Sequence, residues 1–148
     1  MFCVLITSVV FGAIMYARGT TEPVDDPFEP AVVTCQVTEG AKGAFTVTNT
    51  GNVPVYLRVY LDPSFVDSSG QRHWTSPTCN VSGAGWTLQN GFYYYNSEIA
   101  PGGTANITAS MSGGSIPSGY SFDVSMSAEV IQSNPKSAAS DAWGYSFG

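Results

Sequence analysis

The longest regular pattern in the chain is an alternation of apolar and polar side chains over residues 120–132. Phe122, Val124, Met126, Ala128 and Val130 are apolar, and the positions between them carry Ser, Asp or Glu. A period of two places each set on its own face of a strand. This segment therefore predicts a strand with one dry and one solvated face, as in an antiparallel sheet covered on one side.

Further strand candidates recur at the spacing of a β-sandwich. They are residues 31–37, 44–49, 55–61, 86–88, 91–96 and 104–111. Residues 62–85 are expected to form a long irregular connection, and no helical periodicity follows residue 16. The pattern predicts an all-β protein with a single jelly-roll or immunoglobulin-like antiparallel β-sandwich over residues 31–132.

Two turn sequences predict which strands are neighbours. Residues 46–61 predict a hairpin, because Asn, Gly and Asn within residues 49–52 tolerate turn geometry and Pro54 suits a strand start. Asn90-Gly91 predicts a second hairpin, because this dipeptide adopts the positive φ angles of a type I′ turn.

Aromatic residues are concentrated in the run Phe92-Tyr93-Tyr94-Tyr95. On a strand, Phe92 and Tyr94 lie on one face and Tyr93 and Tyr95 on the other. One pair meets the core, and the opposite pair lies under a loop, on a ligand or against another subunit. Tyr93 and Tyr95 are the candidates for the subunit contact.

The C-terminal tail, residues 133–148, is small and polar until its last six residues. Trp143, Tyr145 and Phe147 then occupy alternate positions. The tail is expected either to dock as an added strand or to remain loose.

The N-terminal part divides into an apolar leader, residues 1–18, and an acidic linker, residues 19–30. Residues 1–16 carry no charge, but they are shorter than the about 20 residues that span a bilayer. They resemble a signal peptide, or a segment retained for insertion into a neighbour or a membrane. No stable membrane span is expected after processing.

Three prolines favour extended backbone in the linker, so residues 19–33 are a candidate donor strand. Its candidate contact residues are Thr21, Val24, Phe28 and Val32.

Composition narrows the function classes. The 148 residues suffice for one domain, and a net charge of −6 with only five Lys and Arg disfavours nucleic acid as a partner. Cys35 and Cys79 are either a disulfide in an oxidising compartment or two free buried thiols. Asn80 and Asn106 match the N-glycosylation pattern.

Signals for catalysis are weak. His73 is the single histidine, no zinc-protease or nucleophile-elbow motif occurs, and no phosphate-binding glycine loop is present. The chain is expected not to be an enzyme and to bind no cofactor or metal.

Several segments, in order, resemble the TasA/camelysin family of exported β-sandwich proteins of Gram-positive bacteria. The matching segments are residues 12–17, 27–39, 48–58, 91–95, 99–102 and 129–132, of which 48–58 reads Thr-Asn-Thr-Gly-Asn-Val-Pro-Val-Tyr-Leu-Arg. The resemblance implies a jelly-roll-like sandwich. For fibre-forming members, it implies that an N-terminal segment of one subunit completes the sheet of the next.

The leading hypothesis is therefore an extracellular or cell-surface structural subunit. Its partners are copies of itself, joined head-to-tail by donor-strand β-augmentation into a filament or pilus-like biofilm-matrix fibre. The alternative is a secreted or surface-anchored glycan-binding or adhesion module that uses Trp74, Trp86 and the outer Tyr pair.

Overall fold

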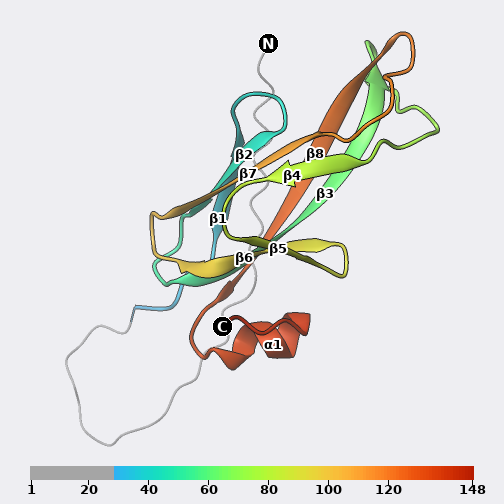
Figure 1. Ribbon diagram of the computed structural model, residues 1–148. Coiled ribbons are helices and arrows are strands. Elements are labelled where there is room, and N and C mark those ends of the chain that lie inside the picture. Colours follow the sequence, from blue (N-terminus) through green and yellow to red (C-terminus); the bar gives the residue numbers. More distant parts are fainter. Residues whose placement is uncertain (1–28) are drawn as a thin grey trace, which may run out of the picture.

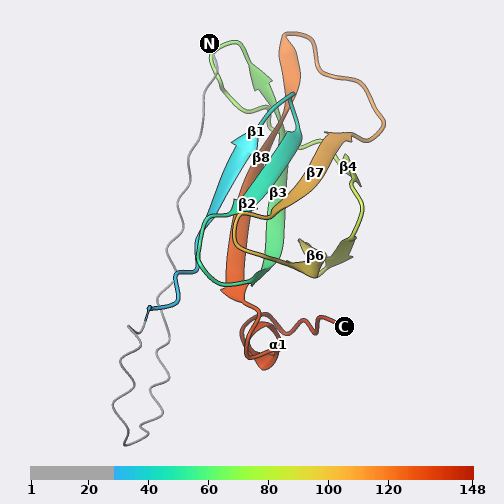
Figure 2. The same cartoon turned by 90° about the vertical axis from the view of Figure 1, so that its left-hand side faces the viewer.

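The computed structural model describes residues 29–148 as two four-stranded antiparallel sheets packed face to face (Figures 1 and 2). The first sheet has the order β1 (Cys35–Glu39), β2 (Ala44–Asn49), β7 (Thr104–Met111), β4 (Cys79–Ser82), and the second has the order β5 (Trp86–Gln89), β6 (Phe92–Ile99), β3 (Val55–Asp67), β8 (Tyr120–Gln132). The expected all-β sandwich is confirmed. The predicted leader and nearly all of the linker lie outside the described residues.

The core lies between the sheets and is built from the alternating apolar positions of both. Val47 and Ile107 from the first sheet meet Val55, Leu57 and Val59 from the second, all of them at most 1% exposed. Each buried aliphatic side chain of this size contributes about 1.5–3 kcal/mol by leaving water. The apolar side chains at alternate positions of each strand thus form the contact surface between the two sheets.

The predicted Asn90-Gly91 hairpin is confirmed. Gln89 pairs with Phe92, and the two residues between them have φ angles of 51° and 82°. Positive φ at both central positions matches the right-handed twist of the flanking strands, so β5 and β6 remain adjacent in one sheet.

The hairpin predicted over residues 46–61 is wrong. Its first strand, β2, belongs to the first sheet, and its second, β3, belongs to the other, so residues 50–54 cross between the layers. Asn49 holds this crossing with a side chain that is 1% exposed. Its Nδ2 donates to the carbonyls of Val53 and Ile99, at 2.8 and 2.9 Å. Its Oδ1 accepts from the Gly51 amide.

Asn49 also bonds to another crossing, between β6 and β7. Its backbone N–H donates to the Gly103 carbonyl at 3.0 Å, and its carbonyl accepts from the Gly102 N–H at 2.8 Å. One residue therefore ties together two of the points at which the chain changes sheet.

The predicted irregular stretch over residues 62–85 contains strand at both ends. β3 continues to Asp67, paired with β8 at every position, and β4 begins at Cys79. Beyond Val59, β3 pairs only with β8, and the two long strands continue as a two-stranded arm whose end extends past the other sheet (Figure 1). Residues 62–67 show no strand pattern of their own, and they form a strand because they pair with the alternating strand β8.

The start of the first strand and the C-terminal region also differ from the prediction. The first strand begins at Cys35 rather than residue 31, because the backbone of Val32 and Thr34 bonds to residues 50–52 instead of a ladder. A helix, α1 (Ser137–Trp143), follows β8. It is too short to show helical periodicity, and Ala139 is its one buried residue. Among residues 29–148, no helix is long and apolar enough to cross a membrane.

Replacing Asn49 tests the crossing. Asn49→Ala leaves two carbonyls and one N–H without a partner in a buried site, so we expect the free energy of unfolding to fall by about 2–4 kcal/mol in urea titrations. Asn106→Ala is the matched control, because its side chain is exposed and bonds only Thr46. An equal, small effect of both substitutions would contradict the role assigned to Asn49.

Candidate functional site

The strand order leaves four edge strands among the described residues, and they lie in two pairs. β1 and β8 border one side of the sandwich, and β4 and β5 border the other. Edge strands present unpaired N–H and C=O groups and are the places where another strand can add. The two sides differ in their charged residues and in how far their apolar side chains are exposed, and this difference locates the candidate site.

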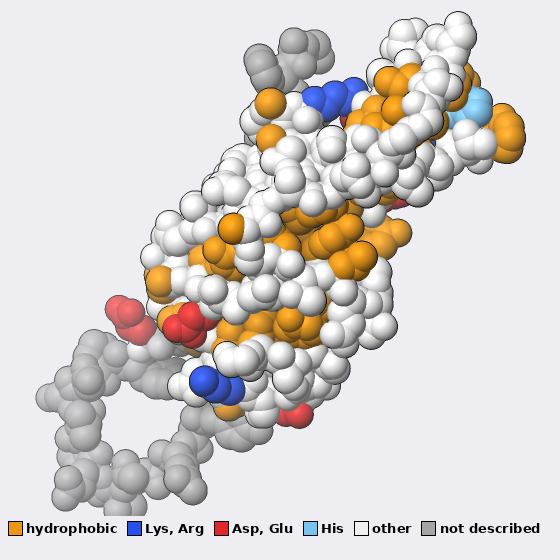
Figure 3. Space-filling model, in the orientation of Figure 1, with side chains coloured by type: hydrophobic (Ala, Val, Ile, Leu, Met, Phe, Trp, Pro, Cys, Tyr) orange, Lys and Arg blue, Asp and Glu red, His pale blue; other side chains and the backbone are white. Residues whose placement is uncertain are grey.

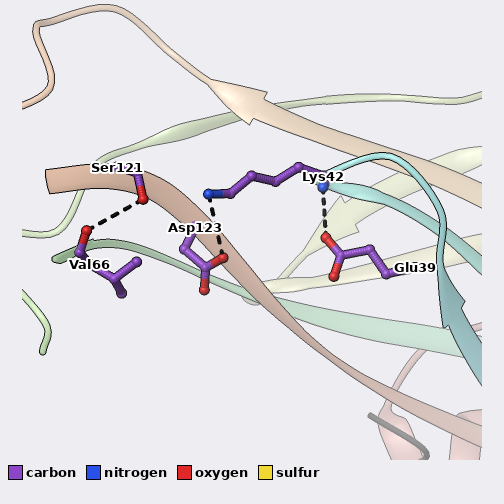
Figure 4. Close-up of polar contacts among 6 residues, drawn as sticks. Glu39, Lys42, Val66, Ser121 and Asp123 are labelled. Atoms are coloured by element: carbon purple, nitrogen blue, oxygen red, sulfur yellow. Dashed lines mark hydrogen bonds and ion pairs between the residues drawn. The ribbon is translucent and has the colours of Figure 1, made fainter. Parts of the chain in front are cut away.

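The side formed by β1 and β8 is bridged by charged groups (Figure 4). Lys42, in the turn after β1, lies 3.9 Å from the carboxylate of Asp123 on β8. Glu39 shapes that turn by accepting a 2.8 Å hydrogen bond from the Gly43 N–H. Both members of the ion pair are half exposed, so it adds at most about 1 kcal/mol to stability. Charges on an edge nevertheless oppose the addition of another strand.

The side formed by β4 and β5 has uncharged strands and apolar side chains that remain partly exposed. Neither strand contains a charged residue. Cys79, Val81 and Tyr93 point between the sheets and remain partly exposed, and Leu88 is 58% exposed. Figure 3 shows hydrophobic side chains gathered on the face that carries these strands. We call these four residues and the two bordering strands the open side.

Tyr93 and Tyr95 do not form the outer pair that the glycan-binding alternative requires. Both pack against the core between the sheets. The Tyr95 ring lies 5.1 Å from that of Trp86, whose Nε1 donates to the Asn106 carbonyl at 2.8 Å. Burial raises the pKa of Tyr93, and the neighbouring Cys79 raises it further. Tyr93 is therefore a neutral, partly buried member of the open side.

The outer face of the same strand carries Phe92 and Tyr94, and the C-terminal tail covers Tyr94. Tyr94 is only 1% exposed, because Tyr145 stacks on it. The tail lies across the face of the sheet and does not pair as an added strand.

Of the two alternatives for Cys35 and Cys79, the structure has the free thiols and no disulfide between them. β1 and β4 are the opposite edges of the first sheet, about 14 Å apart across three strand spacings. Cys35 pairs with Asn49 near one end of the sheet, and Cys79 pairs with Met111 near the other. A disulfide requires Cα atoms within about 7 Å, so opposite corners cannot be bridged.

The aromatic residues of the predicted glycan site are not brought together. Trp74 lies in the loop between β3 and β4 at the end of the arm and is 89% exposed, whereas Trp86 is in β5. His73 packs its ring against Phe65 and Tyr120, and its Nδ1 bonds Thr75. Within residues 29–148, no three His, Cys, Asp or Glu side chains form a group that could hold a metal ion.

The other predicted residues lie as follows. Thr21, Val24 and Phe28 are outside the described residues. Val32 is described and 44% exposed, and its backbone is held by Asn52 through hydrogen bonds of 2.7 and 3.1 Å. Asn80 and Asn106 are both exposed on the first sheet.

Comparison of the chain with protein-family models, with curated proteins and with solved structures finds no significant match. A functional interpretation therefore rests on the residues and geometry described above.

Thiol labelling tests the positions of Cys35 and Cys79. Burial raises the pKa of both thiols, so both hold less thiolate near neutral pH than a free cysteine and react slowly. In a Cys3→Ser background we expect two titratable thiols without reductant, with Cys79 alkylated first and both rates rising as pH increases. Cys79→Ser should remove the faster phase. A protein with no titratable thiol until it is reduced would contradict this assignment.

Proposed function

We propose that this protein is an extracellular or cell-surface structural subunit that polymerises head-to-tail into a filament or pilus-like fibre by strand addition. The observation that carries the proposal is the open side, where uncharged edge strands flank partly exposed apolar side chains. An added strand would satisfy the free backbone groups of β4, and alternate side chains of that strand would cover Val81 and Tyr93. Neither catalysis nor a cofactor is part of this proposal.

The strand order favours β4 as the acceptor. Three consecutive strands of each sheet, β2-β7-β4 and β6-β3-β8, have the order found in a jelly roll. In a jelly roll with this order, β5 would lie beside β4. In this chain the Asn90-Gly91 turn folds β5 back onto β6 instead. The place beside β4 is therefore left for another strand, and we infer a jelly-roll-like sandwich that is completed by a neighbouring subunit.

The position of the linker favours a donor from a second copy. Residues 30–34 are held by residues 50–52 just before β1, at the edge of the sheet opposite β4. The last residues of the donor segment, residues 19–33 in this proposal, are thus anchored on one side of the domain while the acceptor lies on the other. Contacts of this head-to-tail kind do not close on themselves and generate filaments.

Electron microscopy of the purified protein tests strand addition. We expect filaments from the full chain and their loss on deletion of residues 19–29 or on Val81→Lys and Leu88→Lys, which place charge on the open side. Ser125→Lys is the matched control, because it adds the same charge to the exposed outer surface of β8. Uniform single particles from the full chain, or filaments unaffected by the open-side lysines, would overturn the proposal.

A second candidate function is glycan binding at the tip of the arm. The exposure of Trp74 favours it, and its loop is well braced: Asp67 Oδ1 accepts from the amides of Ser69 and Gln71, and Arg72 pairs with Asp62 at 2.6 Å. An exposed indole offers a stacking surface for the apolar face of a sugar ring.

Glycan-array screening with the full chain tests this candidate. We expect any specific signal to fall at least about tenfold in Trp74→Ala, since one aromatic stack contributes on the order of 1 kcal/mol or more. Tyr60→Ala is the matched control, because Tyr60 is an exposed aromatic residue away from the tip. An absent signal, or equal loss in both variants, would remove this candidate.

A further inference from the structure

The C-terminal segment is bound to the outer face of the second sheet by its aromatic side chains. Trp143, Tyr145 and Phe147 are partly buried, whereas Gly144, Ser146 and Gly148 between and after them are exposed. The segment therefore turns one side toward the sheet and the other toward solvent, with the rings on the sheet side.

Two ring pairs have the same stacking geometry. Tyr145 lies on Tyr94 of β6, and Phe147 lies on Tyr56 of β3, each with ring centroids 3.9 Å apart and planes 5° from parallel. The Tyr145 and Phe147 rings also meet edge-on at 4.7 Å. Stacked pairs of this kind contribute about 0.5–1.5 kcal/mol each beyond the apolar area they bury.

Trp143 completes the contact through a cation. The Arg58 guanidinium lies 4.1 Å from the ring centre of Phe92 and 4.8 Å from that of Trp143. Glu129, directly opposite on β8, accepts from Arg58 at 2.6 and 2.7 Å. The carboxylate holds the guanidinium in place, and both aromatic rings contact it.

The backbone contributes little to this contact. In residues 144–148 the one backbone hydrogen bond runs from the Gly144 N–H to the Ser140 carbonyl, within the segment itself. The one polar contact with the sheet is between the Tyr145 hydroxyl and Asn96 Oδ1, at 3.3 Å. The sheet thus recognises three rings at alternate positions, as a groove recognises a peptide, and does not gain a strand.

The connection to the sandwich is weakly held. Asn134, Pro135 and Lys136 are exposed, and α1 has no side-chain cap at its start and no acidic residue in its first turn. A helix of this length has little stability of its own. The segment is therefore joined by a surface link to a site that binds it mainly through side chains.

We propose that the outer face formed by Tyr56, Arg58, Phe92 and Tyr94 is a peptide-binding site for segments with aromatic side chains at three alternate positions. Its occupant in the isolated subunit is residues 137–148, and the same segment of a second copy can replace it. Exchange of an identical element between copies needs no new contact, because each site receives the residues it already fits. This inference uses a different surface from the open side and does not depend on strand addition.

The experiment uses a full chain with a protease site inserted after Pro135. The folded protein is cut and then incubated with a labelled peptide of residues 137–148, and binding is followed by fluorescence anisotropy. We expect uptake of the labelled peptide, competition by the unlabelled peptide, and affinity lowered at least about tenfold by Tyr145→Ala with Phe147→Ala in the peptide. The Ser146→Ala peptide is the matched control and should bind like the original.

A second measurement covers the case in which the cut protein unfolds. Unlabelled and heavy-isotope copies of the uncut chain are mixed at raised temperature and examined by native mass spectrometry. We expect mixed dimers that are lost in Tyr145→Ala with Phe147→Ala but retained in Leu88→Lys, which alters only the open side. No uptake of the peptide by folded, cut protein, equal binding of the ring-deficient peptide, or the absence of mixed dimers would overturn the inference.

Discussion

The buried amide of Asn49 is the interaction on which the arrangement of the two sheets depends. Its hydrogen bonds to Val53 and Ile99 join two of the places where the chain passes from one sheet to the other. A buried amide that loses such partners costs far more than an exposed one, so the crossings are held in a single geometry. Residues 50–52, positioned by this amide, then bond residues 30–34 and set where the chain enters β1.

The two sides of the sandwich follow from the order of the strands in the two sheets. The chain changes sheet between β4 and β5, so these two strands are edges that do not pair with each other. One side is bridged by Lys42 and Asp123, and the other presents only uncharged strands and partly exposed apolar residues. The proposed assembly uses this asymmetry: in it, the charged edge would oppose an added strand and the uncharged edge would accept one. The outer face is a separate surface, covered by the C-terminal rings.

Local sequence predicted those features whose cause lies within a few residues. The alternation over 120–132 and the Asn90-Gly91 turn each specify their own geometry, and both occur as predicted. The predicted hairpin over residues 46–61 was wrong, because turn residues allow the chain to reverse but do not determine which sheet the next strand joins. Alternation correctly placed Tyr93 and Tyr95 on the opposite face of the strand from Phe92 and Tyr94. It could not show which of the two pairs packs against the core. The role of Asn49 had no local signal beyond its place in a turn.

The sequence by itself determined an all-β protein with strands of defined faces, because side-chain period and turn chemistry act over neighbouring residues. Only the tertiary structure decided which edges remain free, that Cys35 and Cys79 lie at opposite corners, and that the last three aromatic residues lie on Tyr56, Arg58 and Tyr94. These outcomes depend on pairing between strands that are far apart in the chain. Such pairing is selected by the packing of the whole core, which no single segment contains.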